Sequence, residues 1–163
     1  MKELTILVVE DSKPMMEIMV TMLTRFGFGK VLTAEDGEQA FSVFQRYKPD
    51  IIITDWHMDE VDGLELAQWI RRNKYSVNRS VPIILMTGFS EHMRISSARD
   101  MGVTEILVKP FNAHDLARRI MHVIDVPRDF VESFEFFGPD RRRKPIDDFD
   151  GDNRRNLDEE KIE

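Results

Sequence analysis

Cysteine is absent from this 163-residue chain, which excludes disulfide bonds and metal sites built on thiolates. No apolar run approaches the roughly 20 residues that a membrane-spanning helix needs, and residues 1–4 lack the apolar core of a signal peptide. An excess of positive charge is missing too, because 30 acidic residues outnumber 23 basic ones and give a formal charge of −7. A negative net charge provides no general attraction to nucleic acids or anionic lipids. We therefore expect a cytoplasmic protein with no membrane segment.

The chain does contain enough apolar material for one packed core, since 42% of its residues are hydrophobic and 33% are charged. Short apolar runs rich in β-branched residues predict buried strands. They occupy residues 6–9, 31–34, 51–53, 81–86 and 106–108. Apolar residues at helical spacing follow these runs. After the first run they include Met15, Met19 and Met22, and Ser12 and Pro14 mark the start of that helix.

Strand and helix alternate five times within about 125 residues. This alternation predicts a parallel sheet, because parallel strands need long crossover connections. Right-handed crossovers place helices on both faces of such a sheet. The predicted fold class is therefore α/β, a doubly wound sheet of five parallel strands, followed by an irregular C-terminal tail.

Polar side chains that suit phosphate chemistry stand where the predicted strands end. Glu10 and Asp11 follow the first strand, Asp55 follows the third, and Thr87 and Lys109 follow the fourth and fifth. In open parallel sheets the carboxyl ends of the strands form the edge where ligands bind. We expect these side chains to meet there.

This set of side chains fits a hard metal ion and a phosphoryl group. Carboxylates that crowd together in ionised form need a cation, and an oxygen-only ligand set favours Mg²⁺. A lysine ammonium and a threonine hydroxyl supply charge and a hydrogen bond to phosphate oxygens. The pattern therefore indicates phosphoryl transfer onto a carboxylate.

The same residues resemble the receiver domain of two-component response regulators, the CheY-like family with a flavodoxin-like (βα)5 fold. The resemblance covers residues 4 to about 126, and we expect residues 1–126 to form the receiver domain. It is carried by separate motifs in the expected strand positions. These motifs are Glu10-Asp11, Asp55, the turn at residues 58–63, Thr87-Gly88 and Lys109-Pro110-Phe111.

The resemblance implies a role for each site residue. It implies that Asp55 is the phospho-acceptor and that Thr87 and Lys109 hold the phosphoryl oxygens. It implies that Mg²⁺ is bound by Asp55, by Asp11 directly and by Glu10 through water. The remaining ligand it implies is the backbone carbonyl of His57. It also implies a cis peptide bond before Pro110, an isomer that sequence alone makes a minority choice.

Two features depart from the family pattern. Ile106 stands where the family often has an aromatic switch residue, three positions before the lysine. Trp56, His57 and Phe89 are bulky, and we expect them near the entrance of the site, where they affect water access.

Residues 127–163 form a C-terminal extension that begins with Pro127, a helix breaker. No helix-turn-helix pattern follows, so no DNA-binding domain is predicted. Phe130, Phe134 and Phe137 recur at spacings of four and three, which predicts one short helix with an aromatic face. If this helix packs on the face of the fourth helix, fifth strand and fifth helix, it would act as an intramolecular gate over the surface that phosphorylation changes. The alternative is a free motif that folds only on a partner. The basic run at 141–144 precedes an acidic end, predicted to be disordered past Pro145.

The sequence thus predicts a single-domain response regulator and not an enzyme. It would take a phosphoryl group from a histidine kinase or phosphotransfer protein and act on a downstream protein target, as a monomer or as a weak dimer formed on phosphorylation. An intermediate phosphate shuttle in a phosphorelay and an adaptor that does not use phosphorylation stay open as alternatives. A phosphohydrolase of the haloacid-dehalogenase type is disfavoured, because His57 stands where those enzymes place a second aspartate.

Overall fold

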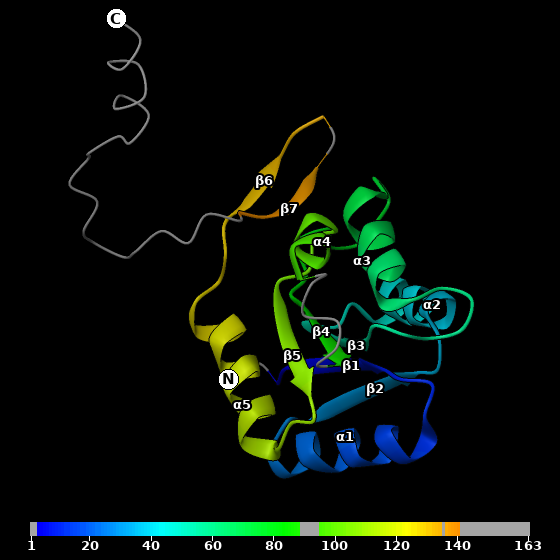
Figure 1. Cartoon of the computed structure of the whole chain (residues 1–163), viewed down its shortest axis with the longest axis vertical. Coiled ribbons are helices and arrows are strands. Elements are labelled where there is room, and N and C mark those ends of the chain that lie inside the picture. Colours follow the sequence, from blue (N-terminus) through cyan, green and yellow to red (C-terminus); the bar gives the residue numbers. More distant parts are fainter. Residues whose placement is uncertain (1–2, 89–94, 135, 141–163) are drawn as a thin grey trace, which may run out of the picture.

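Five parallel strands form the centre of the molecule, in the order β2-β1-β3-β4-β5 (Figure 1). The structure is a computed structural model that describes residues 3–88, 95–134 and 136–140. Its elements are β1 (Thr5–Val9), α1 (Lys13–Arg25), β2 (Lys30–Ala34), α2 (Gly37–Tyr47), β3 (Ile51–Asp55), α3 (Gly63–Arg72), β4 (Ile83–Gly88), α4 (Ile95–Asp100), β5 (Glu105–Lys109), α5 (Ala113–Asp125), β6 (Phe130–Glu132) and β7 (Phe137–Pro139). The predicted α/β fold with a five-stranded parallel sheet is confirmed.

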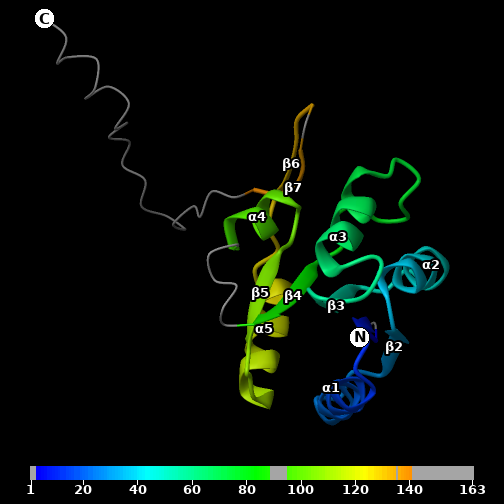
Figure 2. The same cartoon turned by 45° about the vertical axis from the view of Figure 1, so that its right-hand side comes forward.

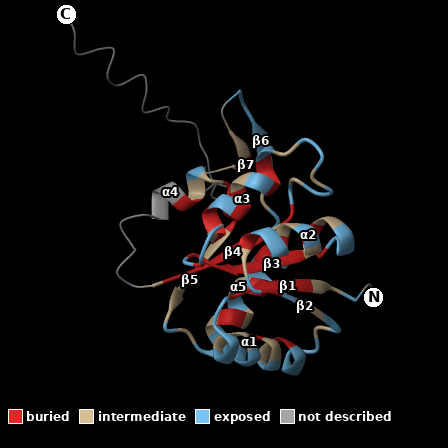
Figure 3. Cartoon of the chain, turned by 90° about the vertical axis from the view of Figure 1, so that its right-hand side faces the viewer, coloured by how far each residue is buried: buried red, intermediate tan, exposed pale blue. Residues whose placement is uncertain are grey.

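Helices cover both faces of the sheet because successive strand residues point to opposite sides. Ile6 and Val8 of β1 pack in a core with residues of α1 and α5, whereas Leu7 and Val9 pack in a second core with residues of α2, α3 and α4. Figure 2 shows α1 on one side of the sheet and α2 and α3 on the other. In Figure 3 the central strands are almost entirely buried, and the helices are buried only on their inner faces. An uninterrupted apolar run therefore serves as a central strand.

Side-chain caps set where the helices begin. The Ser12 hydroxyl accepts a hydrogen bond from Met15 N–H at 3.5 Å, and Pro14 lies in the first turn of α1, as predicted. Asp62 opens α3 with a capping box, in which its side chain accepts from Glu65 N–H and the Glu65 carboxylate accepts from Asp62 N–H. Within the residues that the structure describes, every helix is too short or too polar to span a bilayer.

The segment after α5 forms an antiparallel hairpin, so the predicted helix with Phe130, Phe134 and Phe137 on one face is wrong. Phe130 pairs with Pro139 and Glu132 pairs with Phe137, so the alternation of a strand decides which side chains share a face. The rings of Phe130 and Phe137 have centroids 5.6 Å apart, whereas Phe134 at the turn is fully exposed. Pro139 is the last residue of β7.

The hairpin lies at the edge of the sheet where the strands begin, and the β5 arrow in Figure 1 points away from it. Its contacts include Arg71 of α3 and Arg79 of the loop after α3, whose guanidinium groups lie 4.9 and 3.9 Å from the centroids of Phe130 and Phe137. Gly138 of β7 also approaches Gly102, which follows α4. The gate hypothesis rests on a helix packed on the face of α4, β5 and α5, and the segment forms a hairpin instead, whose arginine contacts are with α3 and the loop after it. The basic run and the acidic end predicted to be disordered lie outside the described residues.

Candidate functional site

Asp55 is the last residue of β3, a strand whose five residues are all buried. Its side chain is 13% exposed, so the carboxylate reaches the surface at the carboxyl end of the sheet. Oδ1 accepts a hydrogen bond from Trp56 N–H at 3.0 Å and another from the Lys109 ammonium at 2.9 Å. Both bonds fall on one oxygen, so the described residues hold Asp55 through Oδ1 and leave Oδ2 for a reactant or an ion.

Glu10 and Asp11 follow β1, which pairs directly with β3. The Glu10 side chain is only 2% exposed, and its Oε1 accepts a hydrogen bond from Ser12 N–H at 3.1 Å. One carboxylate oxygen from each of Glu10, Asp11 and Asp55 lies within 4.8 Å of the others. The structure therefore brings the three predicted acidic residues into one cluster.

Lys109 ends β5 and reaches across β4 to the acidic cluster. Its ammonium lies 2.9 Å from Asp55 Oδ1 and 3.6 Å from Glu10 Oε2. Burial by itself lowers the pKa of Lys109, but the hydrogen bond and the charge of Asp55 outweigh burial and raise it. Lys109 is thus a cation at neutral pH. The peptide bond before Pro110 is cis, as the resemblance implies.

The acidic cluster carries more negative charge than its surroundings balance. Burial, helped by the charge of Asp55, raises the pKa of Glu10 against the hydrogen bond from Ser12. Glu10 Oε2 is buried and has no hydrogen-bond partner among the described residues, because the 3.6 Å contact with Lys109 is an ion pair only. A buried carboxylate oxygen beside two other carboxylates is a suitable ligand for a hard divalent cation. The residues present therefore fit Mg²⁺.

Thr87 lies on β4, next to the strand that carries Asp55. Asp55 is opposite Met86 in the register of β3 and β4, so Thr87 stands one step further towards the carboxyl edge. It is 2% exposed, and its hydroxyl donates to the Gly88 carbonyl at 3.4 Å, a long and weak hydrogen bond. Thr87 thus stands on the strand between the strands that carry Asp55 and Lys109.

The loop after Asp55 folds back over the end of its own strand. Gly63 N–H donates to the Trp56 carbonyl at 2.9 Å, and a Cβ at position 63 would lie 2.3 Å from the Asp55 carbonyl oxygen. Only glycine permits this approach. The expectation that Trp56 stands at the site entrance is wrong, because it is 4% exposed and belongs to the core. His57 is exposed, and its ring stacks on Trp56 with a centroid distance of 5.7 Å.

Ile106 at the position of the usual aromatic switch is half-buried and packs against the core on the side of α2, α3 and α4. Phe89, the third bulky residue expected at the entrance, lies outside the described residues.

Sequence reasoning missed the role of Arg71, which is 1% exposed. Its guanidinium donates to the Gly102 carbonyl at 3.0 Å, to the Arg79 carbonyl at 2.7 Å and to the Thr104 hydroxyl at 3.4 Å. Burial lowers the pKa of Arg71 to about 9, which still leaves it charged at neutral pH. A signal was present in the sequence, because Arg71 is four residues after Ala67 and so falls on the apolar stripe of its helix.

A family model, the response regulator receiver domain, matches residues 6–121 of the chain. The phosphate regulon transcriptional regulatory protein PhoB of Pseudomonas aeruginosa is 32% identical over 120 residues, which are 74% of this chain and 51% of PhoB. The probable transcriptional regulator ycf27 of Porphyridium aerugineum is 32% identical over 124 residues, 76% of this chain and 49% of that protein. The chain thus spans about half the length of these curated relatives.

Solved receiver domains share the fold. The chemotaxis response regulator CheY4 of Vibrio cholerae is 28% identical with a TM-score of 0.68, over 75% of this chain and 99% of CheY4. The receiver domain of the sensor histidine kinase PA1611 from Pseudomonas aeruginosa is 28% identical with a TM-score of 0.67, over 76% of this chain and 99% of that domain. Its crystal structure has a magnesium ion coordinated in the active-site cleft.

Proposed function

Because the chain belongs to the response regulator receiver domain family, we propose that Asp55 accepts a phosphoryl group from a histidine kinase or a phosphotransfer protein. Receiver domains are signalling domains of two-component systems. The proposal depends on one observation: the Lys109 ammonium forms an ion pair with Asp55 Oδ1 at 2.9 Å, beside the carboxylates of Glu10 and Asp11. A carboxylate nucleophile, a fixed cation and a cluster of hard ligands are what phosphoryl transfer onto an acid requires.

In the proposed reaction Asp55 Oδ2 attacks phosphorus and forms a P–O bond. The bond between phosphorus and the imidazole nitrogen of the donor breaks, and that nitrogen keeps the electron pair. Trp56 N–H and Lys109 hold Oδ1 and orient the carboxylate for attack. After transfer, the Lys109 ammonium and the Thr87 hydroxyl hold phosphoryl oxygens.

Receiver domains bind Mg²⁺ in an acidic site, and we assign the equivalent site to Glu10, Asp11, Asp55 and the backbone carbonyl of His57. When bound, the ion neutralises charge on the carboxylates and on the phosphoryl oxygens. The residues of the chain then position the reactants. The proposed output is a changed protein surface that a downstream protein target recognises.

The test is phosphorylation of the full chain by a small-molecule phosphodonor with Mg²⁺, followed by intact-mass measurement. We expect the mass to rise by one phosphoryl group, and Asp55→Asn to abolish the gain while the protein stays folded. Asp59→Asn, a change of the same kind in the exposed loop nearby, serves as the matched control and should label normally. Turnover of the donor without a stable mass gain would instead indicate a phosphohydrolase, and no reaction at all would indicate an adaptor.

A further inference from the structure

The C-terminal hairpin is anchored to the body of the molecule by two arginines. Arg71 runs past Gly102, where a Cβ would lie 2.7 Å from the Arg71 Cγ, and its guanidinium faces the Phe130 ring at 4.9 Å. Arg79 stacks on Phe137 at 3.9 Å. Cation–π contacts of this kind are strongest where water is excluded, as at the buried Arg71. The hairpin therefore has a fixed position on the receiver fold.

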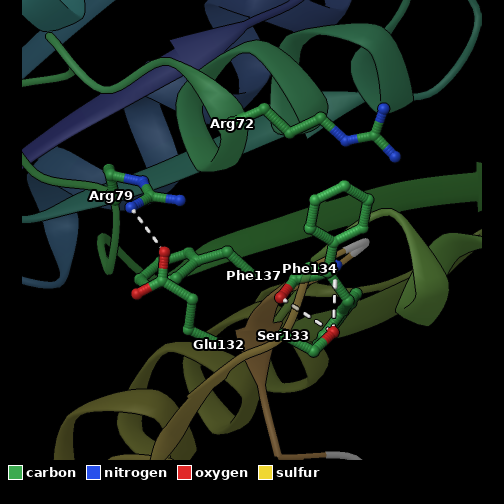
Figure 4. A pocket seen from close by; sticks show the side chains of 7 residues that line it. Arg72, Arg79, Glu132, Ser133, Phe134 and Phe137 are labelled. Atoms are coloured by element: carbon green, nitrogen blue, oxygen red, sulfur yellow. Dashed lines mark hydrogen bonds and ion pairs between the residues drawn. The ribbon is translucent and has the colours of Figure 1, made fainter.

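A cavity of about 610 Å³ lies between the fixed hairpin and α3, and we call it the hairpin pocket. Figure 4 shows Arg72 of α3 extending above the ring of Phe134, with Arg79 and Glu132 joined further along the cavity. The distance between Arg79 Nη1 and Glu132 Oε1 is 3.4 Å. Two guanidinium groups and the aromatic rings of the hairpin thus line one hollow, and Glu132 supplies the one carboxylate among the described residues of this lining.

Two side chains of the hairpin pocket, those of Arg72 and Phe134, are exposed and make no specific interaction with the described residues. Arg72 is exposed and has no ion pair, hydrogen bond or ring contact with any described residue, in contrast to Arg79. Phe134 exposes its whole side chain to solvent at 105% of the reference area. An unpaired guanidinium favours a carboxylate, and an isolated exposed ring on a fixed scaffold favours an apolar side chain. Arginine and aromatic residues are also the commonest anchors of protein interfaces.

Charge indicates which kind of partner fits. The chain as a whole is negative at −7, whereas the charged residues of the described pocket lining are two arginines and one glutamate, and this lining favours negative ligands. In the sequence, the basic run 141–144 starts two residues after β7 ends. A nucleic acid is disfavoured because binding to its backbone needs several cations, and Arg79 of the described lining is already paired with Glu132.

We propose that the hairpin pocket binds a short acidic peptide segment of a partner protein that carries an aromatic side chain among its carboxylates. A carboxylate pairs with Arg72, and the aromatic ring packs on Phe134. The pocket lies at the end of the sheet opposite to Asp55, so this activity goes beyond the proposed phosphoryl transfer and does not depend on it.

The test uses the full chain and a fluorescein-labelled peptide of two aspartates, two glutamates and a central tryptophan, measured by fluorescence anisotropy. We expect saturable binding that weakens as salt is added, because exposed charges are screened. Arg72→Glu should weaken binding about tenfold or more, since it replaces attraction by repulsion, and Arg72→Lys should keep part of it. Phe134→Ala should weaken binding to a similar degree.

Arg25→Glu is the matched control, because it makes the same change of charge at an exposed position on α1 and should leave binding unchanged. Thermal unfolding should show that Arg72→Glu and Phe134→Ala stay folded, since neither side chain has a partner in the described part of the chain. Absence of saturable binding, or equal binding by the wild type and both pocket variants, would overturn the proposal.

The chain itself carries one segment of the required chemistry, Asp147-Asp148-Phe149-Asp150. A full-length variant with these aspartates changed to asparagine and the phenylalanine to alanine therefore belongs in the same experiment. Binding of the peptide by the wild type supports an external partner. Binding only by the 147–150 variant would overturn that proposal and assign the hairpin pocket to the chain's own segment.

Discussion

Replacing Arg71 by methionine tests how strongly the hairpin is joined to the receiver fold. Methionine keeps much of the length of the side chain but removes the donors to the carbonyls of Gly102 and Arg79, at 3.0 and 2.7 Å. Each buried acceptor left without a donor costs roughly 1–3 kcal/mol. The Thr104 hydroxyl keeps a partner, because it also accepts from Ile83 N–H at 3.0 Å.

One effect of the substitution opposes this loss of stability. The methionine variant no longer buries a cation that has no carboxylate partner among the described residues. Since two carbonyls and the stacking on Phe130 are lost together, we expect the free energy of unfolding to fall by about 2–3 kcal/mol.

Urea denaturation measures this change, and hydrogen exchange across residues 130–139 shows whether the hairpin loosens with it. Arg72→Met provides the matched control, because Arg72 is exposed on the same helix and should change stability by less than about 0.5 kcal/mol. A neutral or stabilising Arg71→Met would refute the reasoning, because it would show that the cost of burying the cation equals or exceeds the value of its contacts.

Three further predictions concern the site. Mg²⁺ should raise the melting temperature of the wild type, and Asp11→Asn should reduce that rise because one hard ligand is lost; an equal rise in both proteins would place the ion elsewhere. Lys109→Ala should still be phosphorylated slowly by a small phosphodonor but lose phosphorylation-dependent binding of a target, because its ammonium no longer holds the phosphoryl group; normal target binding by this variant contradicts that role. Gly63→Ala should lower the free energy of unfolding by about 2 kcal/mol or more in a urea titration, because its Cβ would lie 2.3 Å from the Asp55 carbonyl oxygen; an unchanged midpoint would show that the loop after β3 can move aside.

The receiver fold follows from the sequence because its signals are local. The run 51–53 is apolar without interruption, and its structure is a strand buried on both faces. The sequence also predicts that Glu10, Asp55 and Lys109 lie close together, since parallel strands present their carboxyl ends at one edge of the sheet.

The hairpin does not follow from local signals. Spacings of four and three between its phenylalanines match a helix, but the pairing of Phe130 with Pro139 and the stacking on Arg71 decide the structure. The contact with Arg71, which lies in another helix far earlier in the sequence, leaves no periodicity in the segment itself. The expectation that Trp56 lies at the site entrance fails for a related reason. The loop that returns through Gly63 buries Trp56 in the core, and no local pattern in the sequence indicates this.

The central claim is that Asp55 accepts the phosphoryl group, and mapping the site of modification tests it most directly. The full chain is labelled by a small phosphodonor with Mg²⁺, digested, and its peptides are fragmented in a mass spectrometer. We predict one acyl phosphate, located on Asp55 and cleaved by hydroxylamine. A phosphoryl group that is stable in base and maps to His57, two residues further along the chain, would contradict the account.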